Sequence, residues 1–121
     1  MLVNHKDLSF LLYDVFNAQE LTKLAPYKEH DKTTFDAVID TANRIAEDYF
    51  APHNAKADEQ EPQFDGQTVT TIPEVKQAWK HYADAGLLNA RQTFAEGGMQ
   101  LPALVHSAYS GLFASANPGT S

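Results

Sequence analysis

The strongest constraint on the fold is an apolar stripe over residues 33–51. Within this stretch, apolar side chains recur every three or four positions, and mostly polar or charged side chains lie between them. The apolar positions are Phe35, Val38, Ile39, Ala42, Ile45, Ala46, Tyr49 and Phe50. This spacing predicts an α-helix that buries one face in a core. Asp31, Thr33 or Thr34 can cap its start, and Pro52 should end or kink it.

The same periodicity predicts further helices on both sides of this one. Their expected ranges are 7–16, 18–24, 73–85 and 102–116. Asp7 is placed to cap the first of them. Thr71 and Glu74 match a capping box at the start of the 73–85 helix, and Gly86 is placed to end that helix in a left-handed conformation. Trp79 falls on the apolar stripe of this helix, so we expect its side chain to be largely buried.

Residues 63–72 have a different pattern. Asp65-Gly66 is a turn pair, and the threonine and β-branched residues after it favour extended backbone. The segment can form a small hairpin or an extended loop, and either is too small to make a sheet that is stable alone. The sequence therefore predicts an all-α fold, a bundle of about five helices with one short extended segment, in a single domain over residues 1–121.

Charge and composition exclude several classes of function. The chain has 9 basic and 16 acidic residues, a net charge of −7, and no cysteine. Nucleic-acid binding and attraction to an anionic membrane both need clustered basic residues, so we expect neither partner. The apolar runs are too short to cross a bilayer, and no signal peptide is recognisable at the N-terminus. We therefore expect a cytoplasmic protein.

No catalytic or metal-binding motif is present. The five histidines include no pair at the spacing of a helical metal site, and without cysteine there is no thiolate ligand or thiol nucleophile. Most carboxylates fall on the expected solvent faces of the helices, where a pair with shifted pKa values is not expected. We expect neither a catalytic residue nor a metal site within the chain.

Two weaker patterns mark candidate binding residues. Gly97 and Gly98 precede the last helix, where they form either a tight turn or a loop near a bound ligand. On that helix, polar and aromatic side chains alternate, and these either line a substrate pocket or include ordinary core residues. The candidate pocket residues are Tyr109, Ser110, Phe113 and Ser115.

The order of five motifs resembles the N-terminal region of acyl-CoA dehydrogenases. They are the segments 7–16 and 46–54, the Asp65-Gly66 to Gly86 stretch with Pro73 and Trp79, the loop Gly97-Gly98-Met99-Gln100-Leu101-Pro102, and the helix end at residues 114–118. The resemblance covers nearly the whole chain. The chain is similar to the branch of the family that includes 3-(methylthio)propanoyl-CoA dehydrogenases. It departs from the family at Glu96, where an aromatic residue is usual, and at Gln100, where a third glycine is usual.

This resemblance implies a role within a larger flavoenzyme. The family has an N-terminal helical domain, a middle β domain and a C-terminal helical domain, and FAD lies between the last two and a neighbouring subunit. The N-terminal domain walls the acyl-CoA pocket, and the catalytic carboxylate lies in the C-terminal domain. We therefore expect a parent oxidoreductase that binds FAD and acyl-CoA. The present chain should be inactive and free of FAD when alone, because the middle and C-terminal domains are missing.

A stand-alone helical protein-interaction module is the alternative, with an apolar groove that takes a partner helix. On the first interpretation, the chain stops between elements of a longer protein and exposes faces that the other domains would cover. We then expect a homo-oligomer that forms through the last helix, around Tyr109, Leu112 and Phe113.

Overall fold

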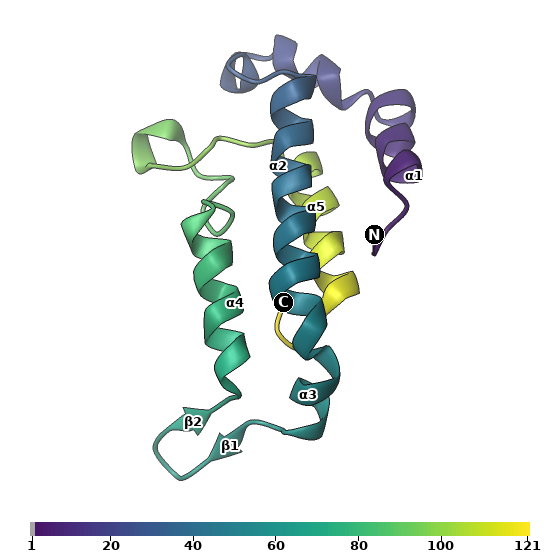
Figure 1. The fold of residues 1–121 in the computed structure, drawn as a ribbon. Helices are drawn as coiled ribbons and strands as arrows, with labels where there is room; N and C mark the ends of the chain where they lie inside the picture. Colours follow the sequence, from purple (N-terminus) through teal and green to yellow (C-terminus); the bar gives the residue numbers. More distant parts are fainter. Residues whose placement is uncertain (1) are drawn as a thin grey trace.

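The structure is a computed structural model, and it describes residues 2–121 of the chain. Three helices run alongside one another: α2 (Lys32–Ile45), α4 (Pro73–Asp84) and α5 (Ala103–Ala116) (Figure 1). The helix α2 packs chiefly against α5, and it continues without a break into a π-helical turn, η4 (Ala46–Phe50), which contacts both α4 and α5. The prediction of an all-α bundle is confirmed.

The core of the bundle consists of side chains from α2, η4 and α5. Phe35, Ile39 and Phe50 are almost fully buried, and Val105 and Tyr109 face them from α5. The stripe that predicted the helix over residues 33–51 therefore does face the core. Asp31 caps α2 by accepting a hydrogen bond from the Thr34 amide at 2.8 Å, as one of the three expected caps.

The N-terminal region is made of short helical turns across one end of the bundle. They are α1 (His5–Ser9), the π-helix η1 (Phe10–Val15), and the 3-10 turns η2 (Ala18–Lys23) and η3 (Ala25–Tyr27). Leu12 and Tyr13 are buried, and the Tyr13 hydroxyl donates to the Asp36 carboxylate at 2.5 Å. The other large apolar side chains of η1 remain exposed, so this region is anchored through one face only.

The opposite end of the bundle holds the hairpin. After η4 the chain continues through η5 (Ala51–His53) and α3 (Asn54–Glu59) to two antiparallel strands, β1 (Gln63–Phe64) and β2 (Val69–Thr70). The hairpin projects beyond the ends of α2 and α4 (Figure 1). Of the two conformations expected for residues 63–72, the chain adopts the hairpin. Within residues 2–121, no helix has both the length and the apolar character to cross a bilayer.

Two predicted caps are wrong. The first helix begins at His5, and Asn4, not Asp7, is its cap, with the Asn4 side chain accepting from the Asp7 amide. The helix α4 begins at Pro73 without a side-chain cap. Glu74 does not reach back to complete a box, because its carboxylate pairs with the Lys56 ammonium of α3 at 2.6 Å.

Two predictions of burial are also wrong. Trp79 is 38% exposed. The helix α4 lies at the side of the bundle (Figure 1), and the indole packs against Tyr82 at the edge of the aromatic side chains. Tyr109, Leu112 and Phe113, expected to form an exposed face on the last helix, are at most 3% exposed. They pack inward because α5 is a central helix, and a homo-oligomer therefore cannot form through this face without unpacking it.

Candidate functional site

An aromatic cluster joins η4, α4 and α5. The Phe113 ring contacts Phe50 edge-on, with centroids 4.7 Å apart, and contacts Tyr82 in the same way at 4.9 Å. Tyr82 in turn packs edge-to-face against Trp79 at 5.2 Å. Such edge-to-face pairs stabilise a packed cluster beyond the area that they bury. The cluster therefore holds α4 against the central pair of helices.

A small apolar pocket opens beside this cluster. Its volume is about 280 Å³. It is lined by Phe50, Trp79, Tyr82, Ser110, Phe113, Ala114 and Ser121. Two of the four predicted pocket residues, Ser110 and Phe113, thus line one cavity. Of its other walls, Phe50, Trp79 and Tyr82 had been predicted as core side chains, and Ala114 and Ser121 complete the lining. No carboxylate or histidine lines this pocket, so it contains no general base.

The other two predicted pocket residues lie elsewhere. Ser115 is exposed on the outer side of α5. Tyr109 is fully buried, and its hydroxyl donates to the Leu87 carbonyl at 2.8 Å. Burial raises the pKa of Tyr109 well above its usual value, and the neighbouring Tyr82 raises it further. The phenol therefore stays protonated and acts as a structural hydrogen-bond donor from α5 to Leu87 in the loop after α4.

A buried polar network borders the pocket at the end of α5. The Asn117 amide donates to the Phe50 carbonyl at 3.0 Å, and its oxygen accepts from the Thr120 amide at 3.1 Å. The Thr120 hydroxyl is 2.9 Å from Nε2 of the buried His53, and its carbonyl accepts from the Trp79 indole at 2.9 Å. These bonds fix the turn after α5 against η4 and α4. Sequence reasoning missed this network, because Asn117-Pro118-Gly119 was interpreted as a simple helix stop and Thr120-Ser121 as the start of another helix cap.

The glycine loop is held in place by its neighbours. Gly97 has a φ of 82°, a left-handed conformation that favours glycine. A side chain at Gly98 would meet the Gln92 carbonyl oxygen at 2.2 Å, so only glycine fits there. The close approach favours the tight-turn interpretation for this pair. Within residues 2–121, neither glycine lines any of the cavities described here.

Gln100 has a backbone conformation that glycine adopts most readily. Its φ of 51° lies in the left-handed region. The Gln100 side chain offsets this strain with two hydrogen bonds, accepting from the Phe94 amide at 3.1 Å and donating to the Pro26 carbonyl at 2.5 Å. Nε2 of His30 lies 2.7 Å from the Met99 carbonyl and adds a third link. The loop is thereby fastened to the N-terminal turns.

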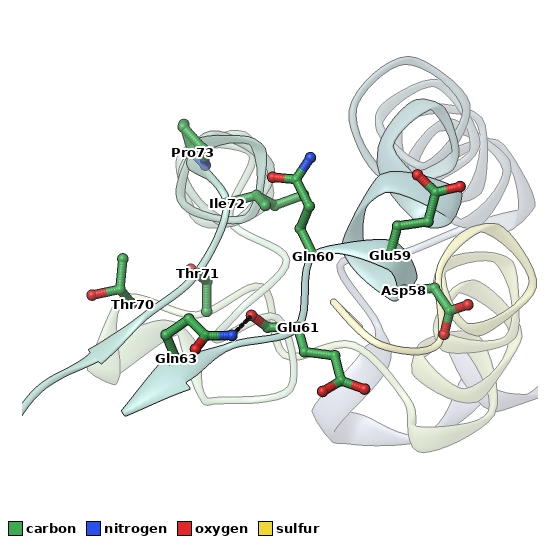
Figure 2. Close-up of a pocket in the computed structure, with 9 residues that line it drawn as sticks. All are labelled: Asp58, Glu59, Gln60, Glu61, Gln63, Thr70, Thr71, Ile72 and Pro73. Atoms are coloured by element: carbon green, nitrogen blue, oxygen red, sulfur yellow. Dashed lines mark hydrogen bonds between the residues drawn. The ribbon is translucent and has the colours of Figure 1, made fainter. Parts of the chain in front are cut away.

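A larger and more polar cavity of about 530 Å³ lies between α3, the hairpin and the start of α4. Figure 2 shows the carboxylates of Asp58, Glu59 and Glu61 around one side of it, and Gln63 and Thr70 on the hairpin side. Every carboxylate here is exposed. Within the described part of the chain, no group of three or more histidine and acidic side chains is arranged to hold a metal ion.

No protein-family model matches the chain, and no curated protein matches it in sequence.

Proposed function

We propose that the chain is the N-terminal helical domain of a flavin-dependent acyl-CoA dehydrogenase and that it supplies one wall of the acyl pocket. The observation that carries the proposal is the apolar pocket between α4 and α5, lined by Ser110 and Phe113. Its lining of aromatic rings and small side chains suits an alkyl chain. Its polar groups are neutral, namely the hydroxyls of Ser110, Ser121 and Tyr82 and the Trp79 N–H, which already donates to the Thr120 carbonyl.

The size of the pocket supports a short acyl group. Its volume of about 280 Å³ is slightly below the roughly 300–1,000 Å³ of pockets for drug-sized ligands. A dinucleotide such as FAD does not fit into this volume, so in the proposed enzyme the flavin is held by the missing middle and C-terminal domains. The absence of an acid or base in the lining assigns α-proton abstraction to those domains too, and the chain alone is expected to oxidise no acyl-CoA.

Ligand titration of the chain itself tests this role. Butanoyl-CoA and free CoA are added in turn, and the indole signal of Trp79 is followed by NMR. We expect butanoyl-CoA to move this signal more than CoA does. Ser110→Leu should fill the pocket and abolish the difference, whereas Ser107→Leu, at an exposed position of α5, should leave it unchanged. Equal shifts with CoA, or full binding by Ser110→Leu, would count against the acyl role.

A second candidate function is a helical protein-interaction module, and the N-terminal region favours it. Four large apolar side chains of η1 and its C-cap, Phe10, Leu11, Val15 and Phe16, are between 46% and 60% exposed. Sedimentation at several concentrations, comparing the wild type with Phe10→Ser/Phe16→Ser, tests homotypic binding. A concentration-dependent mass that the variant loses supports the module, and a monomer throughout removes homotypic binding through this surface.

A further inference from the structure

The hairpin β1–β2 is the most isolated part of the described chain. All residues from 58 to 71 are exposed, and the hairpin projects from the end of the bundle (Figure 1). A two-stranded hairpin is marginally stable by itself in water. Phe64 lies directly opposite Val69 in the antiparallel register, so the two side chains share one face. They are 68% and 60% exposed, which leaves an apolar pair without a partner within residues 2–121.

The other face of the hairpin is polar and is bordered by acidic groups. Side chains alternate across a strand, so Gln63 and Thr70 point away from the apolar pair. They line the cavity of about 530 Å³ together with Asp58, Glu59 and Glu61 (Figure 2). The apolar pair and the acidic cavity thus lie on opposite faces of the same two strands.

The charged side chains of residues 57–75 all have the same sign. Residues 57–75 contain five acidic residues and no lysine, arginine or histidine. Of the five, only Glu74 forms an ion pair within the described chain, with Lys56. Hydrogen bonds from the turn amides of Gln67 and Thr68 to Asp65 lower the pKa of that carboxyl, so it stays ionised. Residues 57–75 therefore carry five negative charges, of which Asp65 lies in the hairpin turn and Asp58, Glu59 and Glu61 lie beside it.

We propose that the hairpin is a docking site for an extended segment of a protein partner in which basic and apolar residues alternate. Each strand of a two-stranded sheet has one edge with unpaired backbone groups, and an added strand can pair with them. The pleat then places alternate side chains of the partner beside Phe64 and Val69 on one face. The remaining side chains lie on the cavity face, where lysine or arginine meets the carboxylates.

The occupant is a different polypeptide and not a second copy of the hairpin. Self-pairing of two such hairpins places like charges together, which is destabilising. Residues 57–75 offer no basic side chain to relieve that repulsion. The inference goes beyond the proposed function, because the hairpin shares no residue with the pocket between α4 and α5.

Two synthetic peptides of equal charge test the proposal against the full chain. One alternates lysine with valine, and the other alternates lysine with serine. We expect the lysine–valine peptide to bind with NMR shifts at residues 58–72, and to bind more weakly as salt is raised. Phe64→Ser/Val69→Ser should weaken this binding roughly tenfold or more through the lost apolar contact. The matched variant Leu24→Ser/Leu88→Ser, which also removes two exposed apolar side chains, should bind as the wild type does.

Three results of the peptide titrations would overturn the proposal: equal binding of the two peptides, equal loss in the Leu24→Ser/Leu88→Ser variant, and shifts that lie outside the hairpin. Sedimentation that shows dimers dissociated by Phe64→Ser/Val69→Ser would also overturn it in favour of a second copy. Far-UV circular dichroism confirms that each variant folds, which is expected because all four positions are exposed. Butanoyl-CoA titration of Phe64→Ser/Val69→Ser distinguishes this proposal from the acyl-pocket proposal, because the variant changes no residue that lines the pocket between α4 and α5.

Discussion

The helices α4 and α5 each place apolar side chains against the core, but they differ in composition and in burial. The sequence of α4 includes Glu74, Lys76, Lys80 and Asp84, whereas α5 has no acidic residue, lysine or arginine. Of α4, only Ala78 is buried, whereas α5 buries Val105, Tyr109, Leu112, Phe113 and Ala116. The difference follows from their neighbours: α5 packs along α2 and η4, whereas α4 has one packed side and one open side (Figure 1). A stripe therefore predicts which face of a helix turns inward. How completely that face is buried depends on how many elements cover it.

The largest effect expected from this difference is at Phe113. Its ring is 3% exposed and contacts Phe50 and Tyr82, so truncation leaves a cavity in a packed region. Phe113→Ala should lower the free energy of unfolding by about 3–5 kcal/mol. Urea denaturation followed by circular dichroism measures the change, with Phe113→Leu as the milder control. A loss close to zero would mean that α5 is not the central helix.

The corresponding change on α4 should cost less. Trp79→Ala removes a ring that is 38% exposed and one hydrogen bond to the Thr120 carbonyl. We expect a loss of about 1–3 kcal/mol, below the usual range for a fully buried aromatic residue. Trp79→Phe, which keeps an aromatic ring but has no N–H donor, should cost about 1 kcal/mol. If Trp79→Ala proves as costly as Phe113→Ala, the two helices do not differ as proposed.

A smaller loss in the free energy of unfolding is expected from a substitution that removes one hydrogen bond of α5 but keeps its packing. Tyr109→Phe keeps the buried ring but removes the donor to the Leu87 carbonyl. We expect a loss of about 1–2 kcal/mol, because the carbonyl loses its partner in a buried site. The tyrosine absorption of the wild type provides an independent check. The raised pKa of Tyr109 predicts that its phenol titrates at higher pH than an exposed tyrosine does.

The secondary structure could be predicted from the sequence where one local signal acted alone. Periodicity located α2, α4 and α5, and glycine located the end of α4 at Gly86, whose φ is 78°. Prediction failed where a distant residue competed with a local one. Glu74 pairs with Lys56 and not with its own helix start, and the π-helical turn η4 is set by packing between three helices. Such contacts have no signature in a window of neighbouring residues.

The candidate site was predictable to the same extent. Ser110 and Phe113 were identified from their place on one helix, and the pocket that they line was not, because its other walls come from η4 and α4. Tyr109 was included because it shares the stripe, although it points into the core. The buried network of His53, Asn117 and Thr120 joins residues more than sixty positions apart. No spacing rule along the chain links them.

The smallest effect expected has the opposite sign and concerns a glycine within α5. Gly111 lies in the middle of this helix, and a methyl group built there meets no atom within 4 Å. Gly111→Ala should therefore raise the free energy of unfolding by about 0.5–1 kcal/mol, because alanine loses less conformational freedom in a helix than glycine does. Gly86→Ala is the matched control and should destabilise. Its φ is 78°, and the new methyl group would lie 2.7 Å from the Met99 side chain. Thermal denaturation of both variants shows whether each substitution raises or lowers the stability of the fold.

A gain in stability at Gly111 means that α5 owes its helical conformation to burial against α2 and η4, in spite of a poor helix former at its centre. A loss there would instead place Gly111 in an unrecognised contact and make the outer side of α5 a packed surface like its inner one.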